Sequence, residues 1–325
     1  MKKKIKIFLT IGPSSLNKKF LTFAEKKKNL ISLVRINLSH VGYKNLRNQI
    51  NFIKKYCSIP ICIDTEGAQI RSKVRKKVNI KKNKIFFLYK RRNNFNLYPE
   101  NVFKQVKKND KLSIGFEGLV AKVISKNDTY AKLKTISSGI LENNKGVHLE
   151  NRNIKLNYIT KKDLDCISLA QRYKINNFAL SFTNSISDIT KFQKLLPYQK
   201  KIFKIESSQA IKNIKLFFLK EKNFLIDRGD LSKSIGIENI PIAQRKILNQ
   251  AKRRKNIQIA IATNFLESMI TRPFPTRAEV NDIYNALELG ADNLVLAAET
   301  AIGKYPKECI IFLEKIINTF KKFKG

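Results

Sequence analysis

One lysine and two carboxylates follow short apolar segments, at a spacing that could serve phosphate chemistry. Lys204 and Glu206 close one such segment, and Asp230 follows the next. Two carboxylates can share a divalent cation such as Mg²⁺, and a lysine beside them can neutralise a phosphoryl group. Similar polar ends recur along the chain, and the arginines among them suit a phosphorylated anionic substrate. These ends are GPSS (12–15), Arg35, Asn37, Ser39, His40, Asp64, Thr65, Arg71, Ser181, Lys204, Glu206, Arg228, Gly229, Asp230, Thr263, Glu299 and Thr300.

Eight short segments rich in β-branched and aromatic residues precede most of these polar ends. Several are near-continuous apolar runs, which is typical of parallel strands covered on both faces. Helical patterns lie between them. The alternation predicts an α/β fold, a (β/α)8 TIM barrel with its active site at the carboxyl ends of the strands. The expected strands are 5–11, 33–37, 61–64, 178–182, 202–206, 224–227, 257–263 and 293–299.

Local signals set the ends of several predicted helices. Thr160 precedes Asp163 by three residues, and Thr276 precedes Glu279 by the same spacing. Each pair predicts a capping box, in which two side chains bond to backbone N–H groups at a helix start. Gly290 is suited to end the second of these helices, because glycine adopts the left-handed conformation there.

Residues 72–150 break the alternation of strands and helices. The interval is rich in lysine and turn residues, holds alternating segments such as KIFFLYK (84–90) and lacks a long amphipathic helix. We therefore predict a small β-rich lid domain inserted after the third barrel strand, with residues 1–71 and 151–325 forming the barrel. The alternative is one long disordered loop, which the apolar alternation disfavours.

Length and composition indicate a folded protein outside the membrane. The chain has 325 residues, of which 43% are hydrophobic, enough for a large core. Lys or Asn interrupts every apolar run before the length that a transmembrane helix needs. The N-terminal apolar segment is short and mixed, so we expect a first strand rather than a signal peptide, and a cytoplasmic protein with no membrane partner.

The formal net charge is +40, from 65 Lys and Arg against 25 Asp and Glu. Such a field attracts phosphates, acidic metabolites and nucleic acid alike. Compositional drift explains the excess better than selection for polyanion binding does, because the lysines are dispersed along the chain and Trp is absent. Compact basic motifs with interleaved aromatic residues are lacking, which disfavours nucleic acid as a partner.

A series of short motifs, in one order along almost the whole chain, resembles the pyruvate kinase family. A long gap falls between the third and fourth motifs, where that family carries its lid. The motifs are TIGPSS (10–15), RINLSH (35–40), DTEGAQIR (64–71), NNKGVHL (143–149), FKIESSQAIKN (203–213), DRGDL (227–231), ATNFLESMI (262–270), PTRAEVNDIYNALELGAD (275–292) and AAETAIGKYP (297–306).

The resemblance implies roles for the residues at the strand ends. Lys204 matches the lysine that stabilises the transferring phosphoryl group and the enolate. Glu206 and Asp230 match the carboxylates that hold the Mg²⁺ bound to phosphoenolpyruvate. Arg35 and Arg71 match phosphate-binding arginines with a catalytic role.

The resemblance also implies how the substrate carboxylate is bound. Gly229 and Asp230 match backbone N–H groups at a helix start, a favourable site for an anion. Thr263 matches the catalytic threonine beside that carboxylate, which supports proton delivery to the enolate. Arg35 and Lys204 complete the expected substrate site.

Two further sites are implied by the resemblance. The residues that match a monovalent cation site, normally for K⁺, are Asn37, Ser39, Asp64 and Thr65. The residues that match positions at the nucleotide are Asn37, His40, Arg71 and Lys145. The expected small-molecule partners are therefore phosphoenolpyruvate and ADP or ATP, and the expected cofactors are Mg²⁺ and K⁺.

The chain departs from the family pattern at several positions. Ala68 and Gln69 replace a proline and an acid, and the lost acid lies beside the K⁺ site. Asp227 stands where the family has a small alanine, which adds an acid near the metal. The family's C-terminal regulatory domain is expected to be absent, and a homodimer through barrel helices, including the one after Thr276, is expected to remain.

The sequence thus favours a phosphotransferase that converts phosphoenolpyruvate and ADP to pyruvate and ATP, the last step of glycolysis. One alternative is a degenerate barrel retained as a basic RNA- or partner-binding protein. Another is an enolate-forming barrel lyase that shares the magnesium carboxylates, which the inserted lid and RINLSH (35–40) disfavour because both would serve a nucleotide.

Overall fold

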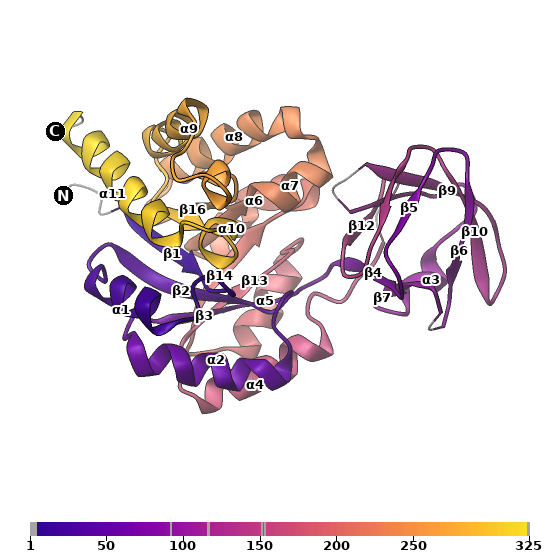
Figure 1. The fold of residues 1–325 in the computed structure, drawn as a ribbon, viewed down its shortest axis with the longest axis horizontal. Coiled ribbons are helices and arrows are strands. Elements are labelled where there is room, and N and C mark those ends of the chain that lie inside the picture. Colours follow the sequence, from indigo (N-terminus) through magenta and orange to yellow (C-terminus); the bar gives the residue numbers. More distant parts are fainter. Residues whose placement is uncertain (1–4, 92, 116–117, 151, 153, 324–325) are drawn as a thin grey trace. The chain divides into compact units, whose positions relative to one another are not determined.

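The computed structural model describes residues 5–91, 93–115, 118–150, 152 and 154–323. The chain divides into two compact units, of which the first joins Met1–Gly67 to Tyr158–Gly325 and the second is Ala68–Asn157 (Figure 1). Among the described residues, no helix has the length and apolarity needed to cross a membrane.

A closed barrel of parallel strands forms the centre of the first unit (Figure 1). Its strands pair in the order β1-β17-β16-β15-β14-β13-β3-β2, and the described part of the barrel contains eight of them. The strands are β1 (Lys6–Thr10), β2 (Ile31–Asn37), β3 (Ile61–Asp64), β13 (Asn177–Leu180), β14 (Lys200–Ile205), β15 (Asn223–Asp227), β16 (Gln258–Ala262) and β17 (Asn293–Leu296). Each contains part of a segment predicted from its apolar pattern, so the predicted TIM barrel is confirmed.

Helices surround this barrel (Figure 1). They are α1 (Lys18–Lys26), α2 (Tyr43–Tyr56), α4 (Lys161–Arg172), α5 (Ile186–Leu195), α6 (Ser208–Lys220), α7 (Arg228–Ile235), α8 (Ile240–Lys252), α9 (Arg277–Glu288), α10 (Ala298–Ala301) and α11 (Pro306–Phe323), with short 3₁₀ helices η1 (Ile237–Asn239) and η2 (Glu267–Ile270). Both predicted capping boxes are present, at Thr160 with Asp163 and at Thr276 with Glu279. Gly290 follows α9 with φ of +98°, as expected for a glycine that ends a helix.

Two apolar layers explain why the strand segments are apolar almost throughout. The larger layer fills the space between strands and helices and includes Phe203 and Phe224, both essentially inaccessible to solvent. The smaller layer contains the alternate residues of the same strands. Its members are Phe8, Cys62, Ala179, Ile202, Leu225, Ala260, Ala262 and Val295. Each large apolar side chain buried in this way contributes about 1.5–3 kcal/mol, which fixes the strands that carry the polar ends.

The last strand is shorter than predicted. We expected it to extend over residues 293–299, but β17 ends at Leu296 and Glu299 lies in the short helix α10. The carboxylate of Glu299 accepts the N–H of Ala297, so the chain turns into a helix where the apolar pattern alone suggested continuation.

The second unit is a β structure that lies in the chain between β3 and β13. Its strands are β4 (Ile70–Val74), β5 (Val78–Ile80), β6 (Ile85–Tyr89), β7 (Phe95–Tyr98), β8 (Lys111–Ile114), β9 (Leu119–Lys126), β10 (Tyr130–Thr135), β11 (Gly139–Leu141) and β12 (Gly146–Leu149), with one short helix, α3 (Val102–Gln105). All but β5 and β11 close a small barrel in the order β10-β6-β7-β4-β12-β8-β9, and β5 pairs with β11. The unit has its own buried core, including Leu88 and Leu133. The predicted boundary at residue 151 lies outside the described residues.

The carboxylate of Glu25, at the end of α1, ties that helix to the segment before β3. It accepts the backbone N–H of Ser58 at 2.7 Å and the Ser58 hydroxyl at 2.8 Å, and it pairs with Lys28 at 3.0 Å. The Ser58 N–H, followed by Lys28, lowers the pKa of Glu25 to about 2. Because this pKa is lower in the folded state, the stabilisation is present above the usual value of 4.5 and is lost as the pH falls toward 2.

We therefore expect Glu25→Gln to lower the free energy of unfolding by about 0.5–1 kcal/mol at pH 6, a small effect because the pair is partly exposed. The difference between the two proteins should shrink as the pH falls from 5 to 3. Urea unfolding of both proteins across this range measures it. An equal difference at every pH would contradict the role of the carboxylate charge.

Candidate active site

The carboxyl ends of the parallel strands bring several predicted site residues to one mouth of the barrel, whereas Arg71, predicted to have a catalytic role, lies in the second unit. Arg35 lies in β2 and Lys204 in β14, and Asp64 is the last residue of β3. Asp230 lies in the first turn of α7, directly after β15. The parallel register that fills the barrel with apolar side chains thus collects these polar ends in one place.

Lys204 lies at the centre of this mouth and is 3% exposed. Its Nζ is 2.8 Å from Glu206 Oε1 and 3.3 Å from Asp64 Oδ2 and from Asp227 Oδ2. The Ser181 hydroxyl lies 3.2 Å from the same nitrogen. Four polar groups from four neighbouring strand ends therefore fix the ammonium group.

These acids determine the protonation of the lysine. Burial on its own lowers the pKa of Lys204, but attraction by Asp64, Glu206 and Asp227 outweighs it, and the pKa is raised. Lys204 is therefore a permanent cation and not a base. Burial raises the pKa of Glu206, and the charges of Asp227 and Asp230 raise it further against the opposing effect of Lys204. Burial and the neighbouring acids together therefore favour the protonated form of Glu206.

Arg35 and Asp64 form a buried ion pair beside Lys204. The distance from Arg35 Nη1 to Asp64 Oδ2 is 2.9 Å, and the two side chains are 6% and 0% exposed. Arg35 also donates Nε–H to the Thr10 hydroxyl at 3.0 Å, and Ser181 donates to Asp64 Oδ1 at 3.2 Å. A guanidinium held on two sides in this way is a preorganised cation for an anionic ligand.

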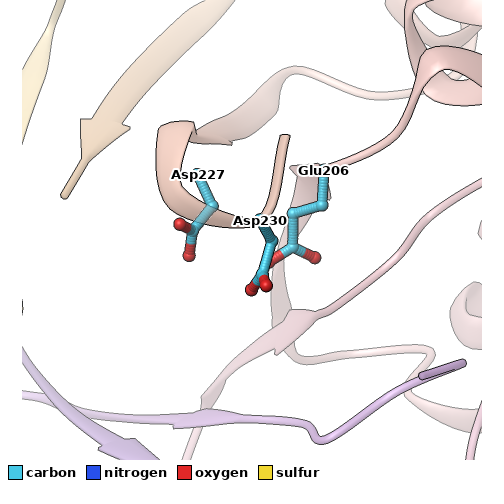
Figure 2. Close-up of side chains that lie close together, drawn as sticks. All are labelled: Glu206, Asp227 and Asp230. Atoms are coloured by element: carbon cyan, nitrogen blue, oxygen red, sulfur yellow. The ribbon is translucent and has the colours of Figure 1, made fainter. Parts of the chain in front are cut away.

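Three carboxylates gather on one side of the mouth. Glu206, Asp227 and Asp230 each offer one oxygen within 4.8 Å of the others (Figure 2). Figure 2 shows Asp227 and Asp230 on the same strand–helix turn, with Glu206 on the adjacent segment. Oxygen ligands of this kind are those that Mg²⁺ prefers.

The environment of Glu206 agrees with a cation site. Its Oε2 accepts the N–H of Phe182 at 2.6 Å. Its Oε1 is buried and close to Lys204, but the approach lacks the angles of a hydrogen bond. We interpret this contact as an ion pair, because the distance of 2.8 Å is short, and infer that Oε1 retains a lone pair for a further ligand.

Thr263 lies directly after β16 and has an unusual backbone conformation. Its φ is +74°, a left-handed conformation that a β-branched residue rarely adopts. Its hydroxyl accepts the N–H of Gly229 at 2.8 Å and donates to the carbonyl of Ala262 at 2.5 Å. Strain of this kind costs about 1–3 kcal/mol and is concentrated at functional sites. The Gly229 N–H, expected at the substrate, is bonded to Thr263 here.

Arg228 fixes this threonine, a role that its sequence context did not reveal. It donates to the carbonyl of Thr263 and forms an ion pair with Asp282 of α9 at 2.7 Å. Its guanidinium lies over the Phe265 ring, 4.4 Å from the centroid. Asp282 lies within the motif at 275–292, but the motif does not show that Asp282 pairs with Arg228, so the fold was needed to identify this support.

Comparisons with known proteins identify the family of this chain. The family model of the pyruvate kinase barrel domain matches residues 2–310. This chain belongs to the pyruvate kinase family. The pyruvate kinase of Thermotoga maritima is 33% identical over 98% of this chain and 71% of its own length. That of Methanocaldococcus jannaschii is 35% identical over 97% of this chain and 69% of its own length, and that of Buchnera aphidicola is 32% identical over 98% and 70%.

The residues that match the family's K⁺ site lie at the ends of β2 and β3. Asn37 and Asp64 are direct neighbours in the strand register. Asn37 Oδ1 accepts the N–H of Ser39 at 2.9 Å, and Thr65 Oγ1 accepts the N–H of Ser181 at 3.0 Å. Both oxygens of Asp64 are engaged by Arg35, Lys204 and Ser181. Asn37 and Asp64 thus lie side by side, but the one charge in the set, that of Asp64, is largely neutralised.

The residues expected at the nucleotide are divided between the two units. Asn37 is the last residue of β2. His40 follows three residues later and is exposed. In the second unit, Arg71 donates to the carbonyl of Asn144 at 3.0 Å, and Lys145 pairs with Glu142 at 3.2 Å. Gln69, which replaces the family's acid, is buried in the second unit.

Proposed function

We propose that this chain transfers the phosphoryl group of phosphoenolpyruvate to ADP, giving pyruvate and ATP. The observation that carries the proposal is the buried Lys204 ammonium, within 3.3 Å of three carboxylates at the barrel mouth. A permanent cation in a water-poor site stabilises charge that develops on a transferring phosphoryl group. Membership of the pyruvate kinase family supports the same reaction.

Each of these residues at the barrel mouth has a separate role in the proposed reaction. Arg35, held by Asp64 and Thr10, binds the phosphate of phosphoenolpyruvate. Lys204 stabilises the phosphoryl group as the bond to the enol oxygen breaks and the bond to the β-phosphate of ADP forms. The same ammonium then stabilises the enolate oxygen left behind. The Thr263 hydroxyl, beside the Gly229 N–H, supports delivery of the proton to the terminal carbon, which gives pyruvate.

Glu206 and Asp230 would hold a divalent cation, and such an ion supplies neutralisation of the phosphate oxygens. Their grouped oxygens and the geometry of Glu206 Oε1 fit that role. Asn37, Ser39, Asp64 and Thr65 fit a K⁺ ion less completely, because Asp64 is already paired. Potassium dependence is therefore open to test.

We further propose that the second unit is the lid of this enzyme. It is inserted in the chain after the third barrel strand, and it carries Arg71 and Lys145, which match nucleotide positions of the family. Asn37 and His40 of the barrel match the family's other nucleotide positions. A lid excludes water, which would otherwise compete with ADP for the phosphoryl group.

The decisive experiment measures pyruvate release from phosphoenolpyruvate and ADP with Mg²⁺, with and without K⁺. We expect ADP-dependent pyruvate formation. A need for K⁺ would support the cation site at Asn37 and Asp64 despite Gln69, and K⁺-independent turnover would remove that site while keeping the reaction. A folded protein that forms no pyruvate would favour the degenerate barrel.

A further inference from the structure

Asp227 is a buried acid at the barrel mouth to which the proposed reaction assigns no role. It is the last residue of β15 and is 6% exposed. Its Oδ2 lies 3.3 Å from Lys204 Nζ. It precedes Asp230 by three residues across the start of α7, so the two carboxylates lie on the same turn (Figure 2).

Among the charged groups at the barrel mouth, the acids outnumber the cations by one. The charged groups in mutual contact are the carboxylates Asp64, Glu206, Asp227 and Asp230 and the cations Arg35, Lys204 and Lys233. Arg228 is omitted because Asp282 neutralises it. Without Asp227, three acids would face three cations. With all four carboxylates ionised, Asp227 adds a negative charge that these cations do not balance, and a bound divalent cation would balance it.

Geometry allows Asp227 to serve the lysine and a cation together. Asp227 Oδ2 lies 3.3 Å from Lys204 Nζ, and one carboxylate oxygen each from Glu206, Asp227 and Asp230 falls within a 4.8 Å cluster. Lys204 also keeps Asp64 and Glu206 as partners, so it does not depend on Asp227 for its charge. The acid is therefore available as a ligand.

We propose that Asp227, at a position where the family pattern has an alanine, is a third protein ligand of the divalent cation and strengthens its binding to the free protein. The inference rests on the proposed function, because it concerns the same cation site. It predicts that the affinity of the free protein for a divalent cation depends on the Asp227 carboxylate.

The test is Mn²⁺ binding to the full chain without substrate, measured by electron paramagnetic resonance of the free ion. We expect Asp227→Ala and Asp227→Asn to weaken binding about 10- to 100-fold, the usual loss for a removed group at a metal site. The matched control is Asp165→Asn, which removes an exposed carboxylate of α4 and should leave the affinity unchanged. Circular dichroism melting of each variant verifies the fold.

Two outcomes would overturn the proposal: wild-type protein that binds no Mn²⁺ without substrate, or Asp227 variants that bind it as tightly as wild type. A second readout separates a ligand from a merely structural residue. Phosphoenolpyruvate should increase Mn²⁺ affinity by a larger factor in Asp227→Ala than in wild type, because the anion then supplies the missing charge. Failure of the proposed function would appear separately, as Asp227-dependent Mn²⁺ binding without pyruvate formation.

Discussion

Replacing Lys204 with arginine is expected to lower kcat for pyruvate formation by about 100- to 1,000-fold while the barrel stays folded. Arginine keeps the positive charge that Asp64, Glu206 and Asp227 require, so the three acids remain compensated. Its planar guanidinium cannot take the place of a compact ammonium that has four polar neighbours between 2.8 and 3.3 Å. The loss should therefore affect turnover much more than stability.

Lys204→Ala should differ from the arginine variant in stability. It leaves three carboxylates in a buried mouth without their common counterion, and breaking a buried pair in this way costs about 3–5 kcal/mol. Denaturant unfolding measures this loss, and added Mg²⁺ should recover part of it by replacing the missing charge. The control is Lys200→Ala at the exposed start of the same strand, which should change neither property. Normal turnover by Lys204→Arg would refute the proposed role.

The barrel could be predicted from the sequence because its physics is local and repetitive. A strand such as β3, covered on both faces, must be apolar almost throughout, and its polar residue must come at an end. That rule is sufficient to place Lys204 and Asp64 at the carboxyl ends of their strands. The rule failed at β17, because the helix after Leu296 depends on the bond between Glu299 and the Ala297 N–H, which the apolar pattern does not encode.

The supports of the site could not be predicted, because they join residues that are distant in sequence. Arg228 contacts Asp282, which lies on a helix beyond the next strand, and the two motifs that contain these residues do not show that they pair. The positive φ of Thr263 likewise follows from the turn that the surrounding structure imposes. Sequence motifs identify the reacting groups, whereas tertiary contacts determine how rigidly those groups are held.

Thr263 allows the hydroxyl and the backbone strain to be tested separately. Thr263→Ser and Thr263→Ala both remove the branched methyl group that makes a φ of +74° unfavourable, so both should relieve part of the strain. Only the alanine variant removes the oxygen that accepts the Gly229 N–H and supports protonation of the enolate. We expect kcat to fall about 100-fold or more in Thr263→Ala and to stay within about tenfold in Thr263→Ser.

Stability should follow a different order from activity in these two variants. Thr263→Ser keeps the bond to Gly229 and loses strain, so its free energy of unfolding should equal or exceed that of the wild type. Thr263→Ala leaves the Gly229 N–H without its acceptor, a loss of about 1 kcal/mol that offsets the relief. Steady-state kinetics and urea unfolding measure the two effects independently. If serine and alanine lowered kcat equally, the methyl group or the backbone conformation, and not the hydroxyl, would be what the reaction requires of this residue.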